Sequence, residues 1–231
     1  MIVFTYLLSN STFSVKDLWI SVKPLVREHQ NTDACLIFDD SIIEKFHTDE
    51  NDLICWHWGH SKGRNVKGIN LFSAFYHTQR NDQSTSIRLP ISFEMIKKTI
   101  RFCDLKTKKE KRASPMSKNE LMQQMIVHSI ANGLVFKYIL ADSWFASSEN
   151  MRFIHQRKKH FIFDLQANRL AVLSESDRQK GSWININEFE ILNNKPVKVW
   201  LKDLEYPLYL SSKFLQTKRP PLRMVQQVSD F

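Results

Sequence analysis

The chain has 231 residues, 42% of them hydrophobic and 25% charged, which is enough apolar sequence for a folded domain with a core and excludes a disordered chain. Lys and Arg outnumber Asp and Glu by 33 to 24, so the net charge of +9 favours a polyanionic partner, nucleic acid before an anionic membrane surface. Three widely spaced cysteines argue against a disulfide framework and for a reducing compartment.

Residues 1–33 begin with a short apolar run and continue with helical periodicity. The run MIVFTYLL is too short to cross a bilayer and no basic residue precedes it, so we expect a cytoplasmic protein. Ser14 and Asp17 have the spacing of a capping box, which predicts a helix start, and Pro24 predicts a break. We interpret residues 1–33 as the remnant of a helical N-terminal region.

Three strands are predicted next. ACLIFDD, residues 34–40, is a short apolar run that ends in two acids, which is typical of a buried strand whose C-terminal end reaches a cleft. The polar residues 41–68 indicate a loop or an extended hairpin arm. VKGINLFSAFYH (66–77) and STSIRLPISFEMI (84–96) are strand-like and separated by a turn-like segment, so together with the first strand they predict an antiparallel meander.

From residue 101 the pattern changes. The Lys- and Arg-rich residues 101–117 predict a solvated linker, and Ser117 with Glu120 predicts a capped helix that stops at Gly133. A strand, a capped helix, a strand and a β-rich segment follow at residues 136–142, 147–160, 161–166 and 170–215. This order predicts an α/β fold with a ribonuclease H-like mixed sheet flanked by helices and a β-rich insertion near the C-terminus.

Acidic residues end two of the predicted strands. Asp39 or Asp40 ends the first strand and Asp142 ends the fourth. If these strands are neighbours, their carboxylates meet at the carboxyl edge of the sheet, where α/β proteins place their sites. Carboxylates suit Mg²⁺ or Mn²⁺, and a pair of such ions supports phosphodiester cleavage. The competing interpretations are a helix cap for Asp142 and solvated strand-end acids for the other two.

Four segments of the sequence resemble a known family. CLIFDDSIIEK, HWGHSKGRNVKGIN, FCDLKTKKEKRASPMSKNELM and YILADSWFASSENMRFI together closely resemble a transposase of bacterial insertion sequences, in the DDE superfamily and the insertion-sequence 4 group. The resemblance runs from about Asp33 to Leu215. It implies metal-dependent cleavage and transfer of DNA strands at insertion-sequence ends, with Mg²⁺ or Mn²⁺ as cofactor. The implied partner is the double-stranded DNA of the transposon ends, with no membrane, and a homodimer is the assembly we expect.

The resemblance also assigns residues. Asp39 matches the first metal-binding Asp of the family because Ser41 follows it by two, Asp40 is its adjacent rival, and Asp142 matches the second Asp. The family's catalytic Glu follows the β-rich insertion in a signature with Tyr, Arg, Glu and Lys, and nothing after Tyr209 matches this signature. We therefore interpret the chain as a truncated, inactive transposase that lacks the third acidic residue.

Under this interpretation the chain has four parts: an N-terminal helical remnant, a partial ribonuclease H-like catalytic core, a β-rich insertion subdomain and an irregular tail that reads as if out of frame. Their predicted bounds are 1–33, 34–166, 167–218 and 219–231.

Basic and aromatic side chains have two interpretations each. Lys62, Arg64 and Lys67 are candidates for contacts with DNA phosphates, and the alternative is the solvated edge of a hairpin. His57 and His60 have a spacing that could hold a metal, but no third partner is near in the sequence, so we expect an aromatic-rich surface arm.

Two other functions are compatible with these patterns. The first is a non-catalytic DNA-binding protein derived from a transposase. The second is a nuclease of the same fold that uses another acid, such as Glu149 or Asp164. For Trp144 and Phe145 we expect places in the core rather than base stacking.

Overall fold

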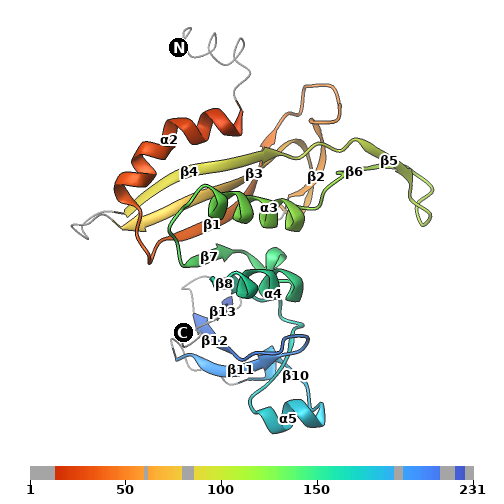
Figure 1. The fold of residues 1–231 in the computed structure, drawn as a ribbon. Coiled ribbons are helices and arrows are strands. Elements are labelled where there is room, and N and C mark those ends of the chain that lie inside the picture. Colours follow the sequence, from red (N-terminus) through yellow and green to blue (C-terminus); the bar gives the residue numbers. More distant parts are fainter. Residues whose placement is uncertain (1–13, 60–61, 80–85, 190–194, 214–221, 227–231) are drawn as a thin grey trace. The chain divides into compact units, whose positions relative to one another are not determined.

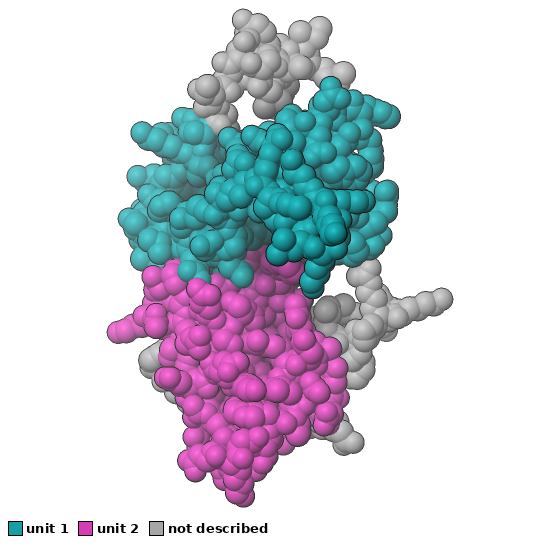
Figure 2. All heavy atoms as spheres, turned by 90° about the vertical axis from the view of Figure 1, so that its right-hand side faces the viewer, with its two compact units in different colours: residues 1–31, 38–135 teal, residues 32–37, 136–231 magenta. Residues whose placement is uncertain are grey.

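The computed structural model describes residues 14–59, 62–79, 86–189, 195–213 and 222–226. The chain divides into two compact units, residues 1–31 with 38–135 and residues 32–37 with 136–231, which Figure 2 colours teal and magenta. Strand β1 (Cys35–Glu44) contributes residues to both units. The domain boundaries that we predicted fall at other positions and stay predictions.

The first unit is built around one long strand. This strand is β3 (Arg64–Gln79). Besides β3 and its part of β1, the described residues of this unit form α2 (Val15–His29), β2 (Cys55–Gly59), β4 (Ser86–Met95), β5 (Ile100–Cys103), β6 (Glu110–Ala113) and α3 (Lys118–Ala131). Strand β3 pairs antiparallel with β2 through its first residues and with β4 through the rest, and β1 is a further neighbour. Every second side chain from Val66 to Thr78 is buried, and α2 packs on β4 and β3 (Figure 1). The predicted meander is confirmed.

The helix break predicted at Pro24 is wrong, because α2 continues through this residue to His29. A proline inside a helix leaves the carbonyl four residues earlier without its N–H partner. That residue is Ile20, whose side chain is 58% exposed, so water can solvate the local backbone. The capping box of Ser14 and Asp17 is confirmed. None of the helices in the described ranges is long and apolar enough to cross a membrane.

The solvated linker predicted for residues 101–117 is also wrong in part, because β5 and β6 form an antiparallel hairpin there. Its turn is held by Asp104, whose carboxylate accepts hydrogen bonds from the backbone N–H groups of Lys106 and Thr107, both at 2.9 Å, and pairs with Lys111. Lysines on a two-stranded ribbon keep it soluble, which is why their density alone suggested a linker.

The second unit contains the remaining elements. In chain order they are β7 (Tyr138–Ala141), η1 (Ser143–Phe145), α4 (Ser148–Gln156), β8 (His160–Asp164), β9 (Leu170–Val172), α5 (Glu175–Lys180), β10 (Ile184–Asn185), η2 (Ile186–Glu188), β11 (Val197–Leu201), β12 (Leu208–Lys213) and β13 (Leu222–Gln226). The start of β1 pairs parallel with β7, and β7 pairs parallel with β8. The strand order β3–β1–β7–β8 with β4 on β3 is mixed, so the predicted α/β class with a ribonuclease H-like order is confirmed.

The C-terminal tail is more regular than predicted. Residues 222–226 form β13, which pairs antiparallel with β12 and with β8 and so joins the β-rich segment to the parallel strands. The two prolines that suggested irregularity precede this strand, and a proline removes a hydrogen-bond donor only at its own position. Residues 219–221 and 227–231 of the predicted tail lie outside the described residues, as does the first part of the predicted helical remnant.

Candidate functional site

Two carboxylates lie at the ends of neighbouring parallel strands in the second unit. Ala141 of β7 pairs with Phe163 of β8, and an aspartate comes next in each segment: Asp142 directly after β7 and Asp164 as the last residue of β8. Burial, and to a smaller extent the negative charge of Asp142, raises the pKa of Asp164 above the usual range of an aspartate. The two side chains are therefore close enough to repel each other, and a cation at this edge would relieve that repulsion.

Asp142 has one structural role that the sequence indicated. Its Oδ1 accepts a hydrogen bond of 2.9 Å from the Trp144 N–H and so caps η1. The longer helix α4 has its own cap, because the Ser147 hydroxyl accepts from the Asn150 N–H at 3.1 Å. The carboxylate of Asp142 is exposed, and capping engages only one of its two oxygens. The cap and a cation ligand are thus compatible roles for the same side chain.

The core positions that we predicted for Trp144 and Phe145 are right only for Phe145. Phe145 is buried in the core, whereas the side chain of Trp144 is 55% exposed.

Asp39 and Asp40 differ in what surrounds them within the first unit. Asp40 Oδ2 accepts hydrogen bonds from Lys118 Nζ at 2.5 Å and from Asn70 Nδ2 at 3.0 Å. The side chains of Asp40 and Lys118 are only 18% and 23% exposed, so this ion pair is largely removed from solvent. Asp39 is exposed, and its Oδ1 accepts from the Asp40 N–H at 2.9 Å. An ammonium group therefore already neutralises Asp40.

The predicted DNA-binding residues lie around the β2–β3 hairpin but not on one face. Lys62 lies in the turn and forms an ion pair with Glu44. Arg64 begins β3 and is exposed, opposite Gly59. Lys67 lies opposite Trp56 and is half-buried. Within the described part of the chain, neither Arg64 nor Lys67 forms an ion pair, so their charges remain available to an anion.

His57 does not lie on the predicted surface arm. It is buried on the inner side of β2, where its Nε2 lies 3.4 Å from Cys55 Sγ. Burial, together with the positive charges of Lys98 and Lys118, lowers its pKa to about 4, so the imidazole is neutral at pH 7. His60 lies outside the described residues. In the ranges that the structure describes, no three His, Cys, Asp or Glu side chains form a group that could hold a metal.

The sequence did not reveal the role of Lys118, and it gave Asp164 only as an alternative. Lys118 is separated from Asp40 by 78 positions, and nothing local marks the contact. Asp164 carries a readable signal, because FIFD is an apolar run that ends in an acid, as are CLIFD and YILAD. Glu149, the other alternative, lies exposed in the first turn of α4, where it complements the helix dipole.

Comparison with known proteins adds a family and a structural likeness. The model of a family described as DDE superfamily endonuclease matches residues 10–185. No curated protein matches the chain. A Drosophila P element transposase strand transfer complex is similar at 10% identity and a TM-score of 0.24, over 66% of this chain. The chain spans 38% of the length of that transposase.

Proposed function

Because the chain belongs to the DDE superfamily of endonucleases, we propose that it descends from an insertion-sequence transposase and binds DNA and a divalent cation, with Asp39 and Asp142 as metal-binding carboxylates. The observation that carries this proposal is the family match, which covers both aspartates. Within the second unit Ile37 of β1 pairs with Leu140 of β7, and Asp142 directly follows β7. Asp39 comes two residues after Ile37 and belongs to the first unit. The insertion-sequence 4 group remains our assignment from the sequence motifs.

Asp40 is the poorer candidate for a metal ligand of the two neighbouring acids. The Lys118 ammonium and the Asn70 amide already engage the Asp40 carboxylate, so a metal there would have to displace a cation. Asp39 is exposed and lies on the opposite side of the strand from Asp40.

The carboxylates fit Mg²⁺ or Mn²⁺, which prefer oxygen ligands. When bound, such an ion would supply activation of water and stabilisation of the leaving oxygen in phosphodiester cleavage. Asp39 and Asp142 would hold that ion beside the bound DNA strand. We propose that Arg64 and Lys67 contact phosphates, and that Lys62 contributes less because Glu44 pairs with it.

We further propose that residues 1–231 by themselves bind DNA without completing cleavage. No glutamate lies between Glu205 and residue 231, the stretch in which the resemblance would place the start of the family's Tyr, Arg, Glu and Lys signature. The non-catalytic DNA-binding protein derived from a transposase remains the alternative, and it differs in needing no metal.

A second candidate function, an active nuclease, is favoured by one observation. Asp164 lies beside Asp142 at the same strand ends and could supply the third carboxylate.

Nicking assays on supercoiled DNA with Mg²⁺ or Mn²⁺ separate these functions, with binding measured in parallel. We expect salt-sensitive DNA binding, heat release on Mn²⁺ titration that Asp39→Asn and Asp142→Asn remove, and no nicking. Nicking that Asp164→Asn abolishes would establish the active nuclease. DNA binding without any Mn²⁺ heat would establish the non-catalytic alternative.

A further inference from the structure

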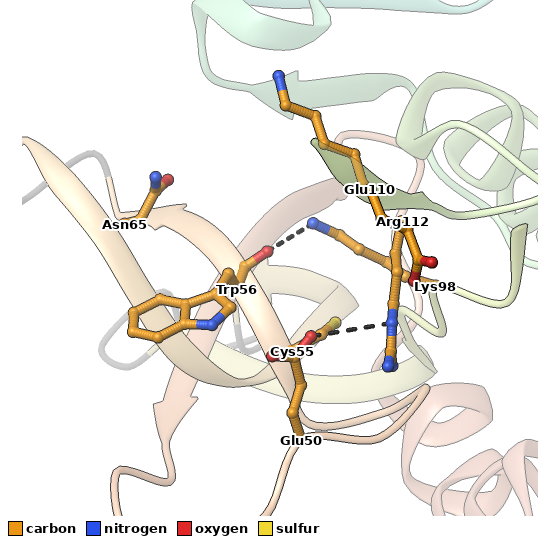
Figure 3. A pocket seen from close by; sticks show the side chains of 8 residues that line it. Glu50, Cys55, Trp56, Asn65, Lys98, Glu110 and Arg112 are labelled. Carbon is orange, nitrogen blue, oxygen red and sulfur yellow. Dashed lines mark hydrogen bonds and ion pairs between the residues drawn. The ribbon is translucent and has the colours of Figure 1, made fainter. Parts of the chain in front are cut away.

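The first unit contains a polar pocket that the metal-binding proposal does not use. Its volume is about 560 Å³, within the range of about 300–1,000 Å³ that is common for ligand sites. Side chains from the β2–β3 hairpin, the β6 strand and the segment between β4 and β5 line it, among them Trp56, Asn65, Lys98, Lys111 and Arg112. Figure 3 shows Trp56 and Asn65 on one side and Lys98 and Arg112 on the other.

One wall of the pocket is an exposed indole. Strand β2 alternates, so that Cys55, His57 and Gly59 are buried while Trp56 and Trp58 are 51% and 54% exposed. The fold therefore leaves two large aromatic rings on the outer face of one short strand. Exposed aromatic side chains beside a basic groove are the platform on which unpaired bases stack.

The opposite wall is cationic and has unused hydrogen-bond donors. Lys98 Nζ donates to the Trp56 carbonyl at 2.6 Å and so fixes the backbone that carries the indole. Arg112 Nη1 is buried and makes no hydrogen bond to any residue in the described ranges. Its carboxylate neighbours are further than hydrogen-bond distance, with Glu50 Oε1 3.8 Å from Nε and Asp52 Oδ1 3.7 Å from Nη1.

The charges of the pocket are not all matched within it. Lys111 pairs with Asp104, and Arg112 has Glu50 and Asp52 beside it, whereas Lys98 forms no ion pair within the described residues. Lys67, which lies opposite Trp56 on β3, adds a further positive charge on the same side of the hairpin. A ligand with an aromatic plane and one negative group would therefore complement both walls, whereas an uncharged aromatic ligand would leave the Arg112 donor without an acceptor.

We propose that this pocket binds one unpaired nucleotide of a DNA strand, with its base stacked on Trp56 and its phosphate bound by Arg112 and Lys98. The inference rests on the proposed function, because that function makes DNA the polyanion. It deepens that function by naming a single-stranded nucleotide as the bound form and a place for it outside the carboxylate site.

The test compares single-stranded and duplex oligonucleotides of equal length by fluorescence anisotropy at low salt, together with the fluorescence of 2-aminopurine placed inside the single strand. Trp56→Ala should weaken binding of the single strand about 5- to 150-fold, the loss that removal of one base–aromatic stack gives, and should abolish the quenching of 2-aminopurine. Trp56→Phe should restore most of both. Phe46→Ala removes a ring that is 49% exposed and does not line the pocket, so it should change neither.

Two further measurements keep the outcomes distinct. Arg112→Gln should reduce the salt dependence of single-strand binding by about one phosphate contact, with folding checked by circular dichroism. Unchanged single-strand affinity in Trp56→Ala, in a protein that still binds duplex, would overturn the pocket alone. Failure of the wild-type chain to bind either DNA would overturn the pocket and the proposed function together.

Discussion

The two neighbouring acids of β1 should respond to substitution in opposite ways, and Asp40→Asn is the sharper test. The substitution keeps the size of the side chain and removes its charge, so Lys118 loses the one carboxylate partner it has within the described residues while staying about four-fifths buried. Breaking a fully buried pair costs about 3–5 kcal/mol and an exposed pair about 0–1 kcal/mol. For this intermediate pair we expect a loss of about 2 kcal/mol in the free energy of unfolding.

Urea denaturation followed by circular dichroism measures this loss. With a slope of about 2–3 kcal/mol per molar urea, the midpoint should fall by about 0.8 M. Lys118→Met, alone and combined with Asp40→Asn, completes a double-mutant cycle, in which the double variant should be less destabilised than the sum of the single ones. A loss below about 0.5 kcal/mol for Asp40→Asn, or strictly additive variants, would contradict the structural role of the pair.

The same variants separate the ion pair from the metal site. Mn²⁺ at a hundred times its dissociation constant should stabilise a chain that binds it by about 2.7 kcal/mol. We expect this gain in the wild-type chain and in Asp40→Asn, and its loss in Asp39→Asn. The reverse pattern would make Asp40 the ligand and would refute the argument from Lys118.

Three other variants test the packing of the first unit. The pKa of His57 is about 4 in the folded chain and about 6.5 in the unfolded chain, so the stability that comes from its neutral form is complete above pH 6.5 and lost as the pH falls towards 4. Urea unfolding should therefore show a free energy of unfolding about 2 kcal/mol lower at pH 5 than at pH 8. His57→Gln should lack this pH-dependent difference. Gly68→Ala should cost at least about 3 kcal/mol or prevent folding, because its Cβ would lie 2.3 Å from the Ile43 carbonyl oxygen, and soluble yield with thermal unfolding would report it. Tyr76→Phe should cost about 2 kcal/mol by the same urea measurement, since it removes the donor to the Val135 carbonyl at 2.8 Å, and a cost near zero would show that water replaces the hydroxyl.

Local signals in the sequence were sufficient for most elements of the fold. The capping boxes at Ser14 and Ser117 mark helix starts that the structure confirms, because each depends on contacts within four residues. The strands that hold the aspartates were equally readable as short apolar runs. The β5–β6 hairpin was not predicted, because the high density of lysines suggested a linker. The hairpin depends on a turn around Asp104, whose carboxylate accepts two backbone hydrogen bonds.

Contacts between distant segments decide what each acid can do, and no local pattern predicts them. Three segments of the sequence consist of an apolar run followed by an aspartate, and this pattern alone does not rank Asp39, Asp142 and Asp164. The predicted strand end at Asp39 or Asp40 is wrong, because β1 continues to Glu44. The pairing of β7 with β8 places Asp142 and Asp164 at the same edge of the second unit, which the sequence does not reveal. The contact of Asp40 with Lys118, across 78 positions, is likewise invisible in the sequence and makes Asp40 a poorer candidate than Asp39. Asp164, at the end of β8, is therefore a candidate for a third carboxylate that substitution can test.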